Sequence, residues 1–499
     1  MLATSLTAAI VGVDAHLVRV EADTASGFPK FTMVGLPDSA VKESEGRIRA
    51  ALRNCGYGFK WDRRITVNFA PASLRKVGSS YDLATAIGLL AADGALPGGT
   101  LGSLLLVGEL ALDGSVRAVS GVLPMMLLAR QQGIEAAFVP AANAREAALV
   151  PGLQVFPVAS LLDAVDLAAV SPRPAPPKAL PAREQSLPYP DLADVRGQPL
   201  ARRALEIAAA GGHNLLLVGP PGSGKTMLAR RLAGILPPLT PPEALEVTAV
   251  HSAAGTALDA LVRSRPFRSP HHTASDVALV GGGSLPRPGE VSLAHHGVLF
   301  LDELPEFRRS VLESLRQPLE EGSITISRVR GSLRLPARFQ LVGAMNPCPC
   351  GGLGAGACAC TPRQAAAYKS RISGPLLDRV DLHVEVPAVA WSEMAGPAGE
   401  GSEAVGQRVR EARRRGEGRR QTPNASLAGE GLREACALDG ESEALLGLSM
   451  QKLGLSARGH DRVLRVARTI ADLDEKAAVG VEHVAEALQF RRCEPDTRG

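Results

Sequence analysis

One run of eight residues, GPPGSGKT, has the residue types and the spacing of a phosphate-binding loop. Glycines allow backbone N–H groups to approach phosphate oxygens closely, and the lysine places a positive charge at the β- and γ-phosphates. The threonine hydroxyl is a ligand for Mg²⁺. The pattern predicts that ATP and Mg²⁺ are bound by Gly219, Pro220, Pro221, Gly222, Ser223, Gly224, Lys225 and Thr226.

Two adjacent carboxylates follow an apolar run farther along the chain. Val298–Leu301 reads as a buried strand, and it delivers Asp302 and Glu303 at its carboxyl end, where open α/β sheets bind ligands. Asp302 is expected to hold Mg²⁺ through water, and Glu303 is expected to polarise the attacking water.

Three further positions could complete the chemistry. Asn346 ends the apolar run FQLVGAMN and could orient water, although an asparagine also caps strand ends. Arg379 could neutralise transition-state charge in the next subunit of a ring, or could form a local pair with a neighbouring aspartate. Arg458 and Arg462 lie four residues apart on one helical face, and one of them is expected to reach the nucleotide.

Four cysteines, Cys348, Cys350, Cys358 and Cys360, follow in the pattern C-x-C-x₇-C-x-C. Four soft ligands within thirteen residues can close a tetrahedral Zn²⁺ site. Free thiols or reversible disulfides are the alternative. A structural rather than catalytic role is expected.

Arginines gather in two other segments. Ser323–Pro336 reads as a hairpin with Gly331 at the turn, and Arg328, Arg330 and Arg334 are expected to crowd its tip and to contact DNA. The alternative is a charged edge that prevents aggregation. The arginine-rich helix at 407–420 is either solvated or in contact with DNA phosphates.

Two histidine pairs, His271–His272 and His295–His296, are awkward metal ligands because adjacent side chains point in different directions. A polar or DNA-facing role is expected for them instead of metal binding.

The elements that must position these residues form three units. The chain has 499 residues, 45% of them hydrophobic, and a net charge of +4, which excludes global disorder. An α/β unit is expected at 1–168, a proline-rich linker at 169–190, a parallel-sheet core at 191–390, a connector at 391–430 and a helical lid at 431–499. The sequence has no run of about 18 uncharged, mainly apolar residues, so no membrane span is expected. The grouped cysteines favour a reducing, cytoplasmic compartment.

Several longer motifs carry a family resemblance. The nucleotide motifs in this order resemble those of AAA+ ATPases. The segments RPFRSPHHTAS, PGEVSLAHHGVLFLDELPEF, LRQPLEEG, NPCPCG and ARTIADL are similar to the magnesium chelatase-like branch, and within it to the YifB/ComM family. The resemblance covers nearly the whole chain.

The resemblance implies a homo-oligomer, usually a hexameric ring, with ATP sites between subunits. It implies Walker A roles for Lys225 and Thr226, Walker B roles for Asp302 and Glu303, and sensor 1 for Asn346. Arg379 becomes the arginine finger and Arg458 the sensor 2 residue, with Arg462 as its competitor. ComM-type members are DNA helicases that promote branch migration in natural transformation, which implies DNA as the partner. The alternative is a chelatase-type remodeller of a protein or a metal-insertion complex.

The N-terminal segment resembles a Lon-protease-type domain, an α+β fold whose peptidases use a Ser–Lys dyad. Ser80 lies near the nucleophile position, but no lysine occurs from Val77 through Val170. An inactive peptidase domain is therefore expected, which disfavours an ATP-dependent protease. The chelatase motor subunit is expected to resemble the ATPase part but not this segment, which argues against a porphyrin substrate.

Overall fold

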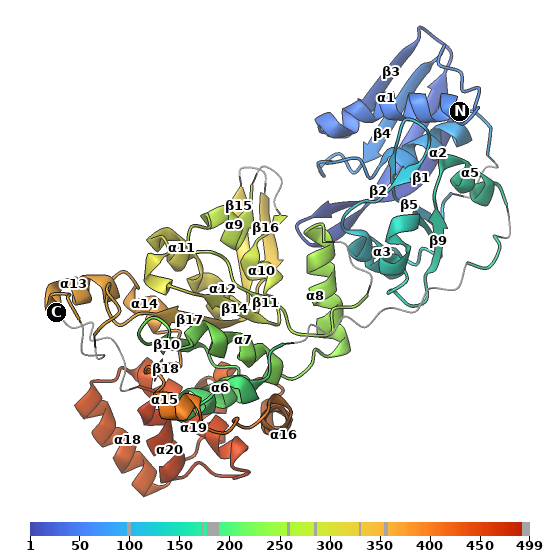
Figure 1. Cartoon of the computed structure of the whole chain (residues 1–499). Coiled ribbons are helices and arrows are strands. Elements are labelled where there is room, and N and C mark those ends of the chain that lie inside the picture. Colours follow the sequence, from blue (N-terminus) through green and yellow to red (C-terminus); the bar gives the residue numbers. More distant parts are fainter. Residues whose placement is uncertain are drawn as a thin grey trace. The chain divides into compact units, whose positions relative to one another are not determined.

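The computed structural model describes residues 1–96, 101–170, 173–176, 189–256, 260–283, 287–328, 331–353 and 358–491. The chain divides into two compact units (Figure 1). Unit 1 comprises Met1–Gln185, Pro241–Arg263 and Leu285–Pro288. Unit 2 comprises Ser186–Thr240, Ser264–Ser284 and Gly289–Gly499.

Unit 1 is built on a mixed seven-stranded sheet with the order β3-β4-β2-β1-β5-β8-β9. The strands are β1 (Leu2–Val11), β2 (Asp14–Ala25), β3 (Lys30–Val34), β4 (Arg64–Ala70), β5 (Leu104–Leu106), β8 (Ala136–Pro140) and β9 (Gln154–Val158). β2 pairs antiparallel with β1 and β4, and the other pairings are parallel. Two short strands, β6 (Glu109–Leu110) and β7 (Val116–Arg117), form a separate ribbon.

Hydrophobic side chains on both faces of this sheet are covered by helices. Leu104 and Leu106 of β5 belong to the core under α1 (Ser39–Asn54), α2 (Asp82–Ala92) and α5 (Leu161–Ala169). Leu105 belongs to the opposite core under α3 (Val122–Gln131) and α4 (Ala144–Ala147). This division follows from the alternation of side chains along a strand.

Helix α8 (Pro241–Ala253) packs in unit 1, although the chain reaches it only after the phosphate-binding loop. Its Leu245 and Ala249 pack against the core under α3. Ser252 accepts a 3.0 Å backbone hydrogen bond from Gly121, and its hydroxyl contacts the buried Glu146 carboxylate. The residues of α8 fall within the core expected at 191–390, but the apolar face of the helix is buried against α3 in unit 1.

Unit 2 is built on a five-stranded parallel sheet, as the apolar runs predict. Its order is β11 (Phe267–Arg268), β14 (Val298–Leu301), β17 (Gln340–Met345), β10 (Leu215–Val218) and β18 (Leu382–Glu385). The chain crosses from β10 to the far edge and returns, so β10 lies where the strand order reverses. Open α/β sheets bind their ligands at the carboxyl ends of strands around this point.

Helices surround this sheet. They are α6 (Pro199–Gly211), α7 (Lys225–Ile235), α9 (Asp276–Val280), α10 (Glu290–Leu293), α11 (Arg309–Ser314), α12 (Arg316–Glu321), α13 (Pro362–Lys369), α14 (Gly374–Leu377) and α15 (Trp391–Met394). Single 3₁₀ turns lie at Leu192–Asp194, Leu304–Glu306 and Asn424–Ser426, with one more at Ala141–Asn143 in unit 1. Two-residue strands are β12 (Gly281–Gly282) and β13 (Arg287–Pro288).

The last hundred residues are helical where described, as predicted. They form α16 (Ser402–Arg420), α17 (Gly429–Ala435), α18 (Gly440–Leu453), α19 (Ala457–Leu473) and α20 (Val481–Gln489). One hydrophobic core joins these helices to α6, α7 and the sheet. A buried chain of hydrogen bonds adds to it: His213 contacts Asp381 at 3.1 Å and Thr469 at 2.8 Å.

The arginine-rich hairpin is present as β15 (Ser323–Arg328) and β16 (Gly331–Pro336). Gly331 is paired with Arg328 and begins β16, and residues 329–330, which join the two strands, lie outside the described residues. Arg334 lies opposite Thr325 in mid-strand. The expectation that Arg334 crowds the tip is therefore wrong, because Arg334 lies three residues after Gly331 within β16.

Candidate nucleotide-binding site

The phosphate-binding loop connects β10 to α7, in the strand–loop–helix context that the motif needs. Gly222 and Gly224 adopt φ values of +79° and +89°, which a side chain would strain. A Cβ atom on Gly219 would lie 2.1 Å from the Val386 carbonyl oxygen, so only glycine fits there. The positive end of the α7 dipole is thereby aimed at the loop.

Lys225, the first residue of α7, is buried and reaches back over the loop. Its Nζ donates hydrogen bonds to the carbonyls of Gly219 and Pro220, each at 2.8 Å, and to Asn346 Oδ1 at 3.2 Å. Burial lowers the pKa of Lys225, and the negative charges of Asp302 and Glu303 oppose this effect. The structure thus brings the predicted phosphate-binding lysine and Asn346 together.

Thr226 and Asp302 also meet, although 76 positions separate them in the chain. The Thr226 hydroxyl donates a 2.7 Å hydrogen bond to Asp302 Oδ2. Asp302 Oδ1 accepts a 2.9 Å hydrogen bond from the backbone N–H of Glu303. A hydroxyl and a carboxylate at one point are oxygen ligands of the kind that Mg²⁺ takes beside phosphates.

The loop offers the donors that a triphosphate requires. Ser223 Oγ is buried and has no hydrogen-bond partner among the described residues, and open space surrounds the position of a Cβ on Gly222. Unpartnered buried donors favour an absent acceptor. Together with Lys225, Thr226 and Asp302, these features fit a nucleoside triphosphate with Mg²⁺.

His272 was not assigned to this site by sequence reasoning. Its Nδ1 lies 3.2 Å from Glu303 Oε2, and its ring lies 4.2 Å from that of His271. Glu303 itself has a left-handed backbone, with φ of +52°. The sequence contains the HHT segment after β11, but nothing in its spacing shows which carboxylate it meets.

The arginines near the C-terminal half contact acidic groups. Arg379 contacts Glu320 and the Pro375 carbonyl. Its neighbour Asp378 faces Arg458 at 3.9 Å and Arg462 at 3.4 Å. The Arg458 side chain is 72% exposed and that of Arg462 is 5% exposed. Among the described residues of the single chain, none of the three arginines contacts the phosphate-binding loop.

The four cysteine sulfurs lie within 4.8 Å of one another. Cys348 Sγ is 3.4 Å from Cys350 Sγ and 3.7 Å from Cys358 Sγ. Backbone hydrogen bonds from Gly352 and Ala359 help to lower the pKa of Cys350 to about 6. These cysteines are not joined by disulfides.

The expected DNA contacts are only partly described. The Arg328 side chain and all of Arg330 lie outside the described residues. Arg334 Nε donates a 2.9 Å hydrogen bond to Ser323 Oγ, back toward the base of the hairpin.

Six of the seven arginines of α16 contact other residues of the described chain. Arg408 contacts Glu206 and Glu400, Arg415 donates to the Asp472 carbonyl, and Arg419 contacts the Asp472 carboxylate. Arg410, Arg413 and Arg420 also make intramolecular contacts. These contacts favour a structural role for α16 over DNA contact.

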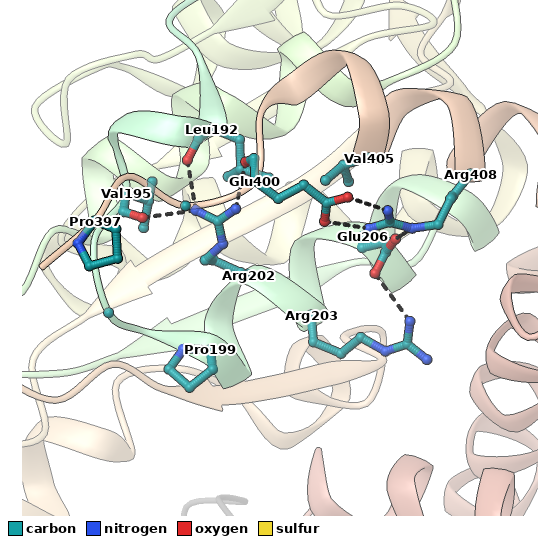
Figure 2. Close-up of a pocket in the computed structure, with 12 residues that line it drawn as sticks. Leu192, Val195, Pro199, Arg202, Arg203, Glu206, Pro397, Glu400, Val405 and Arg408 are labelled. Atoms are coloured by element: carbon teal, nitrogen blue, oxygen red, sulfur yellow. Dashed lines mark hydrogen bonds and ion pairs between the residues drawn. The ribbon is translucent and has the colours of Figure 1, made fainter. Parts of the chain in front are cut away.

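A cavity of about 360 Å³ lies beside α6 and the segment 397–408 (Figure 2). Arg202 donates hydrogen bonds to three backbone carbonyls there, and Arg408 pairs with Glu206 and Glu400. These charged groups pair with one another, so the cavity is lined by an intramolecular ion-pair cluster. Its lining residues include none of those predicted to bind nucleotide.

Ser80 in unit 1 is half-buried. The preceding lysine, Lys76, is fully buried and donates to the carbonyls of Phe69, at 2.7 Å, and Pro71. Its ammonium is thus engaged by backbone, and burial lowers the pKa of Lys76.

Three family models match the chain. "Magnesium chelatase, subunit ChlI" matches residues 191–394, "Subunit ChlI of Mg-chelatase" matches residues 20–143, and "Magnesium chelatase, subunit ChlI C-terminal" matches residues 399–491. The second match corrects the expectation that the chelatase resemblance excludes the N-terminal segment.

No described helix is long and apolar enough to cross a membrane.

Relatives match over almost the whole length. YifB of Escherichia coli is 46% identical over 97% of this chain and 96% of its own. Competence protein ComM of Haemophilus influenzae is 45% identical over 98% of this chain and 97% of its own. The magnesium-chelatase 67 kDa subunit of Chlorobaculum parvum is 31% identical over only 31% of this chain and 23% of its own. The chain therefore belongs to the YifB/ComM family of magnesium chelatase-like proteins, which is of the AAA+ ATPase type.

Proposed function

We propose that the protein is a ring-forming, ATP-driven motor that acts on DNA. The observation that carries the ATPase part is the convergence of Lys225, Asn346, Thr226 and Asp302, with Glu303 adjacent, at the carboxyl ends of β10, β14 and β17. Residues from three strand ends meet there because the strands are parallel neighbours.

Each residue has a role that its position suggests. ATP supplies the phosphoanhydride bond, and Thr226 and Asp302 would hold Mg²⁺. Lys225 would exchange the Gly219 and Pro220 carbonyls for phosphate oxygens, because its charge is poorly satisfied by neutral partners. Glu303 would accept a proton from water, and Asn346 would orient that water.

In the proposed ring, Arg379 would act on the nucleotide of a neighbouring subunit. In the single chain this side chain pairs with Glu320, so action on a neighbouring subunit's nucleotide requires release from that pair. Arg458, the more exposed of the two sensor 2 candidates, is the one free enough to swing toward a nucleotide.

Two observations support DNA as the substrate. A relative that shares nearly the full length of this chain is named a competence protein. The hairpin carries Arg328, Arg330 and Arg334, while aromatic residues make up only 3% of the chain. Few rings are available for base stacking, so DNA would be gripped mostly through phosphates, without sequence preference. Branch migration in DNA uptake and recombination is the process we propose.

The test is ATP hydrolysis with and without forked or branched DNA. We expect DNA to stimulate hydrolysis severalfold, and Glu303→Gln to abolish hydrolysis while nucleotide binding persists. Glu441→Gln, an exposed glutamate at the start of α18, is the matched control and should behave like the wild type. Hydrolysis that no DNA structure stimulates would overturn the DNA assignment.

A chelatase-type remodeller is the second candidate, since all three matching family models are named for magnesium chelatase. It predicts Mg²⁺ insertion into a porphyrin in the presence of partner subunits, with no response to DNA. The short match to the Chlorobaculum subunit, against the full-length match to ComM, favours DNA. The cofactors we propose are ATP, Mg²⁺ and a structural Zn²⁺ in the cysteine cluster.

A further inference from the structure

The four cysteines near the nucleotide site have the spacing of a metal-thiolate cluster. A tetrahedral site with Zn–S bonds of about 2.3 Å has sulfur–sulfur distances of about 3.8 Å. The sulfur–sulfur separations are 3.4 Å for Cys348–Cys350 and 3.7 Å each for Cys348–Cys358 and Cys350–Cys358. A disulfide would bring two sulfurs to about 2.05 Å. These three separations match one face of such a tetrahedron, and Cys360 Sγ lies within 4.8 Å of the other three sulfurs.

The two Cys-x-Cys segments are also held together by their backbones. The backbone N–H of Ala359 is directed at the Cys350 sulfur, and that of Cys350 is directed at the Cys360 sulfur. The Gly352 N–H adds a second donor to Cys350. Backbone donors of this kind disperse the negative charge of metal-bound thiolates and orient the ligands.

The cluster is in direct contact with the phosphate-binding loop. Gly351 has φ of +78°, and a Cβ atom added to it would lie 2.4 Å from Pro221 Cδ. Its N–H donates a 3.0 Å hydrogen bond to the Cys348 carbonyl, which closes the turn between the first two cysteines. The turn thus packs the backbone of Gly351, which has no side chain, against Pro221.

The cluster also adjoins Asn346 from two directions. Asn346 precedes the buried Cys348 by two residues, and it accepts the hydrogen bond from Lys225. On the other side, Cys360 is followed by α13, and Tyr368 of that helix hydrogen-bonds to the backbone of Asn346. Loss of the cluster would therefore remove the restraint on the chain at Asn346 and at the start of α13.

We propose that Cys348, Cys350, Cys358 and Cys360 bind one Zn²⁺, and that this ion braces the phosphate-binding loop and Asn346 for nucleotide binding. The inference deepens the proposed ATPase and rests on it for the nucleotide, but not for the metal. The metal acts through position: it fixes Gly351 against Pro221 and Asn346 beside Lys225.

Metal content and nucleotide affinity test the two parts separately. The full chain, purified in a reducing buffer without added metal, should contain one Zn²⁺ by elemental analysis. Exchange with Co²⁺ should give the absorption of a tetrahedral tetrathiolate. Cys348→Ser and Cys360→Ser should lose the metal, whereas Cys55→Ser, a cysteine of unit 1, should keep it. Absence of both stoichiometric Zn²⁺ and the Co²⁺ spectrum would overturn the site.

Binding of a fluorescent ATP analogue tests the brace without requiring hydrolysis. Removal of Zn²⁺ from the wild type by a chelator should raise the Kd about tenfold, and added Zn²⁺ should restore it. Gly351→Ala keeps all four ligands, so it should retain one Zn²⁺ while its Kd also rises, because the new methyl group displaces Pro221. An unchanged Kd after zinc removal would overturn the brace. A zinc-dependent Kd in a protein that hydrolyses no ATP would contradict the proposed ATPase and leave this inference standing.

Discussion

His272 Nδ1 lies 3.2 Å from Glu303 Oε2, so the carboxylate that we expect to activate water is already engaged by a residue from another loop. His272 follows β11 and Glu303 follows β14, and these strands are parallel neighbours. The pair holds Glu303 in its present rotamer. Reorientation of Glu303 toward a nucleotide has to break this contact.

Replacement of His272 should therefore release Glu303. We expect His272→Ala to raise DNA-independent ATP hydrolysis about 2- to 10-fold, the equivalent of one modest hydrogen bond, and to reduce the stimulation by DNA. His271→Ala is the control, because the His271 Nδ1 contacts Thr273 instead of a glutamate. A fall in basal hydrolysis in His272→Ala would show that the contact activates Glu303.

Substitution should show a functional role for Arg458 and a structural role for Arg462. Arg458→Ala removes an exposed side chain, so we expect an unchanged Tm and a kcat for ATP hydrolysis about tenfold lower. Arg462→Ala removes a buried side chain and leaves Asp378 without its closer partner, and should cost about 1–3 kcal/mol of stability. Denaturant unfolding and steady-state kinetics on both variants check this, and the reverse assignment would follow if only Arg462→Ala lowered kcat.

Acid should destabilise the protein through His383. Burial, followed by the positive charges of Arg491 and Arg462, lowers the pKa of this β18 histidine to about 3. The unfolded chain takes up a proton near pH 6.5, whereas the native state does not until about pH 3. The stabilising contribution is therefore complete above pH 6.5 and is lost as the pH falls toward 3, by about 1.4 kcal/mol per pH unit.

His383→Leu should flatten the dependence of unfolding free energy on pH between 6.5 and 4.5. His16→Gln, an exposed histidine of β2, should leave that dependence unchanged. Equal slopes in wild type and His383→Leu would show that His383 titrates normally in the native state.

Glu146 should hold α8 in unit 1. The carboxylate accepts hydrogen bonds from the Ser252 hydroxyl, the Leu123 N–H at 3.0 Å and the Asn143 amide at 3.2 Å. Glu146→Ala leaves three buried donors unpaired and should cost about 1–3 kcal/mol. Hydrogen exchange should speed up selectively in α8 and in the first turn of α3. Glu135→Gln, near the start of β8, is the control, and uniform exchange across unit 1 would contradict a specific anchor.

Hairpin arginines should control the salt dependence of DNA binding. Arg328→Ala and Arg330→Ala should each weaken binding to all sequences alike and reduce the slope of log Kd against log salt by about 0.9. Arg334→Ala should do less, because its side chain is drawn toward Ser323. Arg410→Ala on α16 is the control, since Arg410 pairs with Glu403. Equal losses in the α16 variant would make that helix the DNA-binding surface.

Much of the nucleotide site could be predicted because its motifs are local. Gly219 to Thr226 act through backbone geometry that a short loop determines by itself, and Val298–Leu301 reveals its burial by composition. The cysteine cluster is similar, since thirteen residues contain all four ligands. The parallel sheet and the helical C-terminal region follow from hydrophobic periodicity in the same way.

The partners of these residues were decided by the tertiary structure alone. Three contacts depend on which strands and helices become adjacent. They are those of His272 with Glu303, of Arg379 with Glu320, and of α8 with α3, which is distant from it in sequence. A sequence carries periodicity and spacing over about ten residues, whereas a side chain's partner is set by packing between segments far apart in the chain. The amino-acid sequence therefore determined which reactive groups the protein carries. The packing of its sheets and helices determined which other residues contact and restrain those groups.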